Sequence, residues 1–521
     1  RDLKPANIFV GSRLEAKLVD FGLSSHFAGR GREVLEPLGD ARGTPAYMAP
    51  EQLRSEHVDA RADLYSLGCM LYELVVGEPP FDGPTAKDIA RCHLDDEPVP
   101  PRERGAPITE PLERLILALM QKDRRARLGH ADDLDQALAE LGVAGPPRAE
   151  VESAVPYLYR PRLIERTEAS TELEAAIRRA AAGQGDRLLI SGDSGAGKTF
   201  LASTATRWAL ELRMTVVTAQ CVTDLGADAG PGVCPARGAL QAFRPLLQLA
   251  LDRSRHGDAN RADRLLGERG RLFEAVLPGV SSVEGLFERH PLPPELSPEA
   301  TERRLAAAVA TTALAVAEDA PLLLVIDDLQ WADRLSLAVL ELLDASRLEG
   351  TPLIVLGTFR RDEAPPPLRA IAANTRTLQL AALSAHGVSQ MVADMLALPE
   401  APPALGEFLF ARSNGNPFFA AAYLKAAVDA RLIVRRHGFW RTSSDAPFDS
   451  LPLPTSLHEL LAIRMAALPA HGLDLLRAAA VLGRTFDEDL LARMTNQSLP
   501  RVVEAMALAR ERRLVHVTDD G

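Results

Sequence analysis

Residues 188–199 read LLISGDSGAGKT, an apolar run that leads into the complete pattern G-x-x-x-x-G-K-T. The glycines let backbone amides wrap around a phosphate group, and the helix expected next offers the positive end of its dipole. The position between an apolar strand and a helix favours this phosphate-binding loop over the alternative, a Gly-rich turn. We expect Lys198 to reach the terminal phosphates and Thr199 to hold Mg²⁺. The candidate nucleotide-binding residues are Gly192, Asp193, Ser194, Gly195, Ala196, Gly197, Lys198 and Thr199.

A second apolar run ends in paired carboxylates. Residues 322–326 (LLLVI) lead directly into Asp327 and Asp328. We expect Asp327 to belong to the Mg²⁺ shell and Asp328 to orient or deprotonate the attacking water. The alternative is a buried strand that happens to end in acidic turn residues. With a third apolar run at residues 353–356, strands alternate with helices, which predicts a parallel sheet with its ligand at the carboxyl ends of the strands.

The sequence DDLQWAD at residues 327–333 resembles that of the STAND branch of the AAA+ ATPases, signalling ATPases often fused to kinases or cyclases. The resemblance covers residues 157–521. It implies that Arg360 senses the γ-phosphate, and that residues 415–419 (GNPFF), with Pro417, form a lid motif beside the adenine. The alternatives are a plain surface arginine and a Gly-Pro loop with two core phenylalanines.

The entry into this region carries two signals. Glu165 precedes Arg166 where the family usually has glycine before arginine, which leaves an adenine contact there in doubt. Residues 171–174 (TELE) form a capping-box pattern, in which the Thr and Glu side chains each satisfy an otherwise unpaired amide. We therefore expect a helix to start at this pattern.

The first seven residues, RDLKPAN, resemble the catalytic loop of a eukaryotic-type Ser/Thr protein kinase without its leading His. In that loop the Asp accepts the proton of the substrate hydroxyl and the Asn holds Mg²⁺. The resemblance gives these roles to Asp2 and Asn7, and it implies that Lys4 steadies the transferred phosphoryl group. Because the motif lacks its first residue, we expect a fragment of a longer protein.

Two further motifs follow in the order of this kinase family. Residues 20–22 (DFG) come after an apolar pair, and the resemblance makes Asp20 a metal ligand. Residues 43–51 (GTPAYMAPE) resemble the substrate-docking segment that closes the activation loop, and Thr44 in it is a candidate catalytic residue. Activation-loop phosphorylation, if it is used, is expected on Ser24, Ser25 or Thr44.

A fourth motif, residues 63–68 (DLYSLG), resembles the start of a buried helix whose Asp braces the catalytic loop. The resemblance also makes Arg127 the partner of Glu51. Ordinary caps and turn residues are the alternative reading of these motifs, but four motifs in family order favour the kinase.

Other parts of a kinase site lie upstream of the catalytic loop in this family: the Gly-rich loop, the strand Lys and its helix Glu partner. Phosphoryl transfer depends on positioning and electrostatic stabilisation, which require all of these parts. We therefore expect the residues printed here to have no useful kinase activity by themselves.

The expected fold class is multidomain, with α+β and α/β parts. A mostly helical kinase C-lobe is followed by a P-loop NTPase with a parallel sheet, a helical lid and the start of a winged-helix module. Apolar residues at helical spacing between Leu112 and Met120 predict a packed helix. Residues 142–147 (GVAGPP) predict a linker. The expected domains are residues 1–141 (kinase C-lobe), 142–156 (linker), 157–384 (ATPase core), 385–450 (lid) and 451–521 (truncated winged-helix-like module).

Helical stretches are expected at residues 471–482 and 499–512, followed by a strand-like run at residues 514–517, and the resemblance to the STAND family implies a winged-helix module here. In this branch the module more often packs on the ATPase as a brake than it binds DNA. The candidate contacts to DNA phosphates are Arg501, Arg510, Arg512 and Arg513.

Composition narrows the class of protein. The chain is 46% hydrophobic, which is ordinary for a globular protein, and no run reaches the roughly eighteen apolar residues of a membrane span. Its four cysteines form no CxxC pair, which is typical of separate thiols in a reducing cytosol. The net charge of −12 argues against a protein that coats nucleic acid.

We therefore expect a cytoplasmic signalling protein that joins Ser/Thr phosphorylation of a protein substrate to an ATP-driven switch, with ATP and Mg²⁺ as cofactors. The switch is expected to alternate between closed ADP and open ATP states. Self-association through the ATPase is a further expectation. Two alternatives stay open: a non-catalytic kinase-like scaffold with an assembly ATPase, and a transcription regulator that binds DNA.

Overall fold

The structure is a computed structural model of the 521-residue chain. It describes residues 3–11, 16–19, 45–54, 58–143, 157–222, 240–256, 259–274, 276–277, 279–290, 297–436, 439–442, 448, 465, 468–482, 486–511 and 515. The chain divides into two compact units. One unit contains residues 163–384 and 414–418, and the other contains residues 1–162, 385–413 and 419–521.

Helices dominate residues 45–143. The central helix is α2 (Arg61–Val76), on which Tyr65 and Tyr72 are fully buried. Gly68 lets α2 approach α4 (Glu110–Leu119) closely, because a Cβ at this position would lie 2.8 Å from the Cβ of Leu119. The helix expected between Leu112 and Met120 is thereby confirmed. The other elements are η1 (Pro5–Asn7), β1 (Ile8–Val10), β2 (Ala16–Leu18), η2 (Pro45–Tyr47), α1 (Pro50–Leu53), α3 (Ala86–Asp95) and α5 (Ala131–Glu140).

The unit that contains residues 163–384 opens with helix α6 (Thr167–Ala181). This helix begins one turn earlier than the TELE pattern predicts. The prediction of a start at Thr171 is wrong, since this residue lies inside the helix. The N-cap is Arg166, whose carbonyl accepts a hydrogen bond from the amide of Ser170. Ala169 packs against the same apolar cluster as the buried face of α6. Thr167 and Glu168 of this additional turn are exposed, so the contact of Ala169 with the apolar cluster is what favours it over a start at the capping pattern.

Five parallel strands form the sheet of this unit, in the order β4-β5-β6-β3-β7. The strands expected at the phosphate-binding loop and at the paired carboxylates are confirmed as β3 and β5. Strand β6 lies between them, so that three strand ends converge at one edge. The strands are β3 (Asp186–Gly192), β4 (Thr215–Gln220), β5 (Leu322–Asp327), β6 (Leu353–Phe359) and β7 (Arg376–Leu380).

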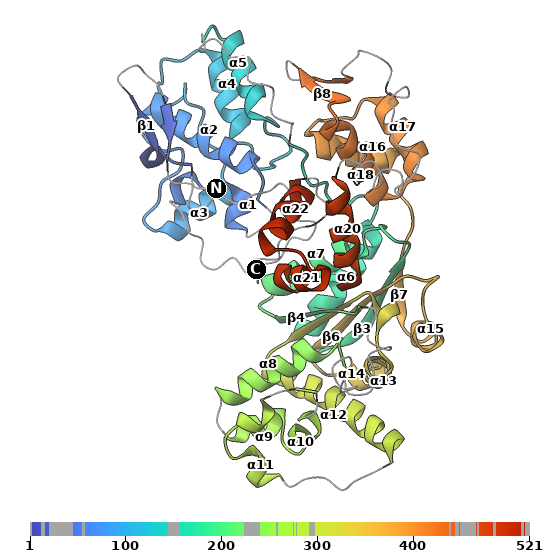
Figure 1. The fold of residues 1–521 in the computed structure, drawn as a ribbon. Coiled ribbons are helices and arrows are strands. Elements are labelled where there is room, and N and C mark those ends of the chain that lie inside the picture. The colour runs from blue at the N-terminus through green and yellow to red at the C-terminus, as the bar shows by residue number, and fades with distance from the viewer. Residues whose placement is uncertain are drawn as a thin grey trace. The chain divides into compact units, whose positions relative to one another are not determined.

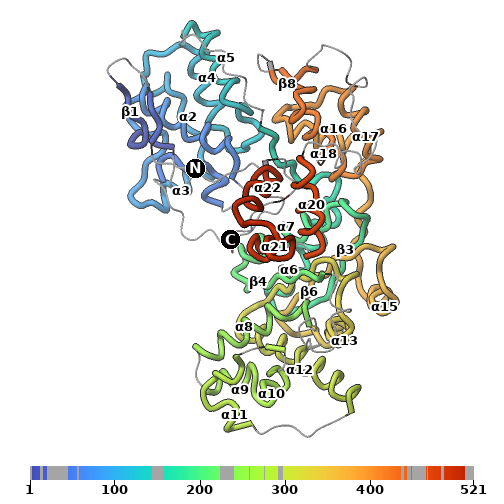
Figure 2. Tube along the Cα trace, viewed as in Figure 1, coloured from blue at the N-terminus to red at the C-terminus, as the bar shows by residue number. Residues whose placement is uncertain are grey.

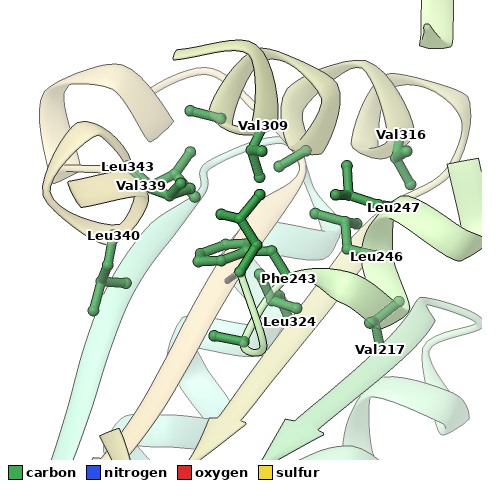
Figure 3. Close-up of a cluster of buried hydrophobic side chains, with 14 of the residues drawn as sticks. Val217, Phe243, Leu246, Leu247, Val309, Val316, Leu324, Val339, Leu340 and Leu343 are labelled. Atoms are coloured by element: carbon green, nitrogen blue, oxygen red, sulfur yellow. The ribbon is translucent and has the colours of Figure 1, made fainter. Parts of the chain in front are cut away.

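Apolar residues cover both faces of this sheet, and helices lie on either side of it (Figure 1). Leu188 and Leu323 belong to a cluster with α6 and α7 on one face. Leu324 belongs to the cluster on the other face, where Phe243 lies in the middle and is fully buried (Figure 3). A strand buried on both faces reads as a continuous apolar run, which is what the sequence of β5 shows.

The described helices between β4 and β5 lie together (Figure 2), and α8 and α12 among them pack on the face of the sheet that carries Leu324. Long helix α12 returns from this group to β5. The helices and 3₁₀ turns of this unit beyond α6 are α7 (Lys198–Glu211), α8 (Arg244–Arg255), α9 (Ala259–Leu265), α10 (Arg269–Phe273), η5 (Val280–Ser282), α11 (Leu286–Arg289), α12 (Pro298–Asp319), η6 (Leu329–Trp331), α13 (Arg334–Leu342), α14 (Ala345–Leu348) and α15 (Pro366–Ala373).

The expected lid region is helical and ends in a short antiparallel hairpin that the sequence did not predict. Beyond it, three helices pack around a small apolar core that includes Leu475, Leu491 and Val502. Within the described ranges, no helix combines the length and the apolar character needed to cross a membrane. The elements are α16 (Ala385–Leu396), α17 (Pro403–Ser413), α18 (Pro417–Asp429), β8 (Ile433–Arg436), β9 (Phe439–Thr442), α20 (Ala470–Leu482), α21 (Glu488–Thr495) and α22 (Leu499–Glu511).

Candidate functional site

The phosphate-binding loop connects β3 to α7, as the sequence predicts. Gly195 and Gly197 adopt φ values of +80° and +96°, in the left-handed region that other residues enter only with strain. Lys198 follows as the first residue of α7, so the free amides at the start of this helix point toward the loop. Backbone shape alone therefore prepares an anion site at the carboxyl end of β3.

The ammonium group of Lys198 lies within this loop. It donates hydrogen bonds of 2.8 Å each to the carbonyls of Gly192 and Asp193, and the side chain is 6% exposed. Burial lowers the pKa of Lys198, the positive charge of Arg360 lowers it further, and nearby carboxylates oppose the shift. A lysine that is partly desolvated and held by carbonyls is available to exchange these partners for phosphate oxygens.

Thr199 and Asp327 meet where β3 and β5 end. The Thr199 hydroxyl lies 3.0 and 3.3 Å from the two carboxylate oxygens of Asp327. Thr358 at the end of β6 donates its hydroxyl to the same carboxylate and accepts the backbone amide of Asp328 at 3.1 Å. Thr358 is fully buried, and it was missed by the sequence argument because only the strand order places β6 here.

Asp328 adopts a left-handed conformation, with φ of +61°, at the turn between β5 and η6. Each of its carboxylate oxygens accepts a side-chain amide: Oδ2 from Gln220 at 3.0 Å, and Oδ1 from Gln330 at 2.9 Å. The Gln330 amide oxygen in turn accepts the backbone amide of Arg360 at 3.0 Å. The strained backbone and the two amides hold the Asp328 carboxylate in one orientation, which is what positioning of a water molecule requires.

The guanidinium of Arg360 is held beside this site. It donates to Glu363 at 2.8 Å, and it lies 5.0 Å from the centre of the Trp331 ring. Arg360 directly follows β6, whose carboxyl end lies between those of β3 and β5 in the sheet. The γ-phosphate-sensing role stays a prediction.

The expected lid motif touches the phosphate-binding loop. The Asn416 side chain donates to the Ser194 carbonyl at 2.7 Å and accepts the backbone amide of Phe418 at 3.1 Å. A Cβ on Gly195 would lie 2.7 Å from atoms of both Asn416 and Phe418, so the glycine is required by this contact as well as by its φ. Pro417 lies between these two residues as the first residue of α18. Its expected place beside adenine stays a prediction.

Glu165, which replaces the glycine usual in the resembling family, makes specific contacts in this structure. Glu165 adopts φ of +52°, the region that favours glycine, the residue usual at this position in the resembling family. Its carboxylate accepts the backbone amide of Ser384 at 2.8 Å and also the hydroxyl of that residue. Arg166 donates to the carbonyl of Ala381. Both side chains fasten the entry segment to the end of β7.

The donor set fits Mg²⁺. Thr199 and Asp327 place a hydroxyl and a carboxylate next to each other. Two protein oxygens are enough for Mg²⁺, because this ion usually keeps water molecules and phosphate oxygens as its other ligands. Within the described part of the chain, no three His, Cys, Asp or Glu side chains cluster so that they could hold a metal ion by themselves. A Mg²⁺ ion held here would share its shell with nucleotide phosphates.

In the kinase region the structure describes only part of the expected site. Asn7 is buried at 8% exposure, its amide donates to the Lys4 carbonyl at 2.9 Å, and its carbonyl accepts the amide of Val19 at 3.0 Å. The expected catalytic loop is thereby fastened to Val19, which directly follows β2. The expected site residues outside the described ranges are Asp2, Asp20 and Thr44.

The predicted pair of Glu51 and Arg127 is confirmed. Two guanidinium nitrogens of Arg127 lie 2.6 and 2.8 Å from the two carboxylate oxygens of Glu51, and both side chains are buried. The same guanidinium also donates to the Arg61 carbonyl at 3.0 Å. This arrangement ties α1, whose first two residues end the expected substrate-docking segment, to the start of α2.

Of the arginines proposed to meet DNA, two lie in the described part of α22. Arg510 pairs with Glu488 of α21, which occupies its charge within the domain, and Arg501 is exposed. Arg512 and Arg513 lie outside the described residues.

The kinase-like region and the region of the phosphate-binding loop each match a known protein family. Residues 1–139 match the protein kinase domain family, and residues 162–356 match the AAA ATPase domain family. The chain therefore joins a protein kinase domain region to an AAA ATPase domain, and it belongs to these families over those residues. Within the kinases, its first part is of the kind found in bacterial Ser/Thr kinases.

Three relatives illustrate this similarity. Serine/threonine-protein kinase PknB of Mycolicibacterium smegmatis is 39% identical over 149 residues, which cover 29% of this chain and 24% of that protein. PknB of Mycobacterium leprae is 36% identical over the same shares. The probable serine/threonine-protein kinase SCO3848 of Streptomyces coelicolor is 37% identical over 134 residues, 26% of this chain and 20% of that protein. The chain thus spans less than a quarter of the length of these relatives.

Proposed function

We propose that residues 163–418 form a nucleotide-dependent switch of the STAND type that binds and hydrolyses ATP. One observation carries the proposal: the Thr199 hydroxyl, the Asp327 carboxylate and the Thr358 hydroxyl meet directly beside the phosphate-binding loop. A turn that was Gly-rich for packing reasons alone would not require this convergence of three strand ends.

Each of these side chains has a separate role in the proposed hydrolysis. Lys198 binds the terminal phosphates, and the loop amides together with the start of α7 bind the others. Thr199 and Asp327 would hold Mg²⁺, which stabilises the negative charge of the phosphates. Asp328, fixed by its two glutamine partners, orients the attacking water and accepts its proton.

The kinase region supports a second proposed activity for the complete protein, the transfer of phosphate from ATP to Ser or Thr of a protein, because the residues printed here are expected to have no useful kinase activity by themselves. The buried pair of Glu51 and Arg127 and the buried Asn7 support an intact catalytic lobe. With its ATPase, the protein would act in signal transduction in the cytoplasm. DNA binding receives no support from α22, where Arg510 is already paired.

Lys198→Ala tests the switch. Purified wild-type chain is expected to bind Mg²⁺–ATP and ADP, measured by calorimetry and by analysis of co-purified nucleotide, and the variant is expected to lose this binding. The matched control is Lys87→Ala, because Lys87 is an exposed lysine of α3 outside the nucleotide site.

The outcome separates the two readings of the loop. Loss of binding in Lys198→Ala alone supports a nucleotide site. Wild-type protein that binds no nucleotide, or a variant that binds as well as wild type, contradicts the ATPase proposal. In that case the loop is a structural turn.

A further inference from the structure

The short segment of residues 157–162, which follows the kinase region, inserts a tyrosine into it. Tyr159 is 2% exposed, and its hydroxyl donates to the Gly129 carbonyl. The Arg61 guanidinium lies 4.3 Å from the centre of the Tyr159 ring, a cation–π contact removed from solvent. This residue is therefore part of the core of the kinase region, although it follows the expected end of the kinase C-lobe at residue 141.

The same segment also pairs with lid helix α16. The backbone amide of Tyr159 donates to the Met395 carbonyl at 2.8 Å, and the backbone amide of Arg162 donates to the Asp394 carboxylate at 2.9 Å. Segment 157–162 thus lies between the kinase region and the end of α16, with backbone hydrogen bonds to the lid and side-chain contacts to the kinase.

Asp394 connects the two regions directly. Its side chain is 7% exposed and lies 3.1 Å from the guanidinium of Arg125 and 3.4 Å from that of Arg162. A carboxylate so buried is stable only with partners of opposite charge, and both partners here are arginines. Arg125 belongs to the kinase region, so this ion pair joins the kinase to the lid.

Close packing surrounds the ion pair. A Cβ on Gly129 would lie 2.6 Å from the Cβ of Ala397, just after α16, so only glycine fits there. Trp440 of the hairpin donates its indole N–H to the Leu396 carbonyl, and its ring lies 6.1 Å from that of His130. We name the surface formed by residues 157–162 and 394–397 with Trp440 the lid dock.

A chain of contacts leads from the lid dock to the substrate-docking segment of the kinase. Arg61, which stacks on Tyr159, pairs with the buried Asp59 at 2.7 Å and offers its carbonyl to Arg127. Arg127 holds Glu51, which is the last residue of the substrate-docking segment and the second residue of α1.

The lid has a second attachment along the chain. Its residues 414–418 belong to the compact unit of the phosphate-binding loop, where Asn416 contacts Ser194. They are covalently continuous with α17 on one side and α18 on the other. A change in the conformation of residues 414–418 is therefore transmitted through the backbone to helices of the unit that contains the lid dock.

We propose that the lid of the ATPase docks on the kinase region through Asp394, Arg125 and Tyr159, and that nucleotide binding acts on the substrate-docking segment of the kinase through this contact. The first half depends on the described contacts alone, and the second half rests on the nucleotide switch proposed above. A ligand shifts such an equilibrium only by its difference in affinity for the two states, so the coupling is measurable from both ends.

Hydrogen exchange with mass spectrometry on the full 521-residue chain tests the docking. Arg125→Glu places a second carboxylate beside Asp394, and Gly129→Leu drives a side chain into Ala397. In each variant, exchange of segment 157–162 and the end of α16 is expected to accelerate roughly tenfold or more, because local opening removes the protecting hydrogen bonds. Adding Asp394→Arg to Arg125→Glu is expected to restore part of the protection.

Two controls make this result specific. Arg91→Glu is the same substitution at an exposed site of α3, and it is expected to change nothing in the lid dock. Peptides from α2 and α4 report whether the kinase region is still folded in each variant. If the lid dock exchanges as slowly in Arg125→Glu and in Gly129→Leu as it does in wild type, the proposed docking is wrong.

Addition of ADP or a non-hydrolysable ATP analogue tests the coupling. In wild type, nucleotide is expected to change exchange in residues 45–54 several-fold, and Arg125→Glu is expected to abolish this change while ADP affinity stays the same. If ADP binds normally but residues 45–54 do not respond in wild type, the coupling is wrong and the switch stands. If ADP does not bind at all, the proposed switch fails, and the docking is still decided by the variants without nucleotide.

Discussion

The hydroxyl of Thr199 lies 3.0 Å from a carboxylate oxygen of Asp327, although 128 positions separate the two residues in the chain. The contact exists because β3 and β5 end at the same edge of a parallel sheet, with β6 between them. Thr358 at the end of β6 completes the group and restrains the Asp327 carboxylate from its buried side.

Thr358→Val should therefore weaken ATP hydrolysis. Valine has the shape of threonine, but it removes one of the hydroxyl groups that bond to the Asp327 carboxylate, which keeps Thr199, and it removes the acceptor of the Asp328 backbone amide. The expected cost is about 1–3 kcal/mol. We expect hydrolysis, measured by phosphate release, to fall roughly tenfold to a hundredfold, in proportion to that energy. Thr377→Val in β7 is the matched control, since its hydroxyl bonds only to the Thr375 carbonyl. Equal hydrolysis in Thr358→Val and wild type would contradict the role of Thr358.

Gly195→Ala should abolish nucleotide binding. The new Cβ would lie 2.7 Å from atoms of Asn416 and Phe418, and the residue would keep an unfavourable φ of +80°. Gly183→Ala separates these effects, because Gly183 has φ of +88° with nothing within 4 Å of its Cβ position. We expect Gly183→Ala to cost about 1 kcal/mol of stability and no affinity. Calorimetry with ADP measures the difference, and equal affinity in both variants would show that the contact with Asn416 does not matter.

The pair of Glu51 and Arg127 should behave as a unit. Removing one member of a buried ion pair leaves the other charge unpaired, so Glu51→Ala and Arg127→Ala should each destabilise the kinase region by about 3–5 kcal/mol. The double variant should lose less than the sum of the two. Pulse proteolysis in urea, read by mass spectrometry of α2 and α4 peptides, measures each midpoint. Strict additivity would mean that the two side chains act independently.

Acid should destabilise the kinase region through its buried histidines. Burial and the charge of Lys122 lower the pKa of His93 from 6.5 to about 4, and its ring bonds to the Tyr65 hydroxyl at 2.9 Å. Between these values the unfolded chain binds more protons than the folded one, so stability is full above pH 6.5 and falls as the pH drops toward 4. The loss from this group is at most roughly 3 kcal/mol.

His93→Gln removes this titration and keeps a hydrogen-bond acceptor for Tyr65. The urea midpoint of this variant should depend less steeply on pH than that of wild type between about pH 7 and 5, the interval in which an ordinary histidine titrates. Burial also lowers the pKa of His130 to about 4, so a smaller slope should remain. His471→Gln, at an exposed position of α20, should keep the wild-type slope. An unchanged slope in His93→Gln would show that His93 does not contribute.

Sequence alone predicted those features that depend on local pattern. The phosphate-binding loop, the strand before Asp327 and the helix between Leu112 and Met120 each have a distinct periodicity or motif, and each is present. The partner of Glu51 was also predicted, through the kinase resemblance.

Features that depend on strand order or tertiary burial were not predicted. Thr358 gave no signal because nothing local places β6 between β3 and β5. Gln220 and Gln330 are common polar residues, and only the fold directs both amides to Asp328. The start of α6 was placed too late because the contact of Ala169 with the apolar cluster, which favours one more helical turn, depends on the tertiary fold.

Trp440 of the lid dock gives the protein an optical signal of its own. The chain has three tryptophans, and Trp208 and Trp331 lie in the ATPase unit, so replacing those two with phenylalanine leaves one emitter, at 6% exposure beside His130. Separation of the lid from the kinase would expose this indole to water and shift its emission to the red. The association of the two regions can then be followed in real time, without labels, as nucleotide is added.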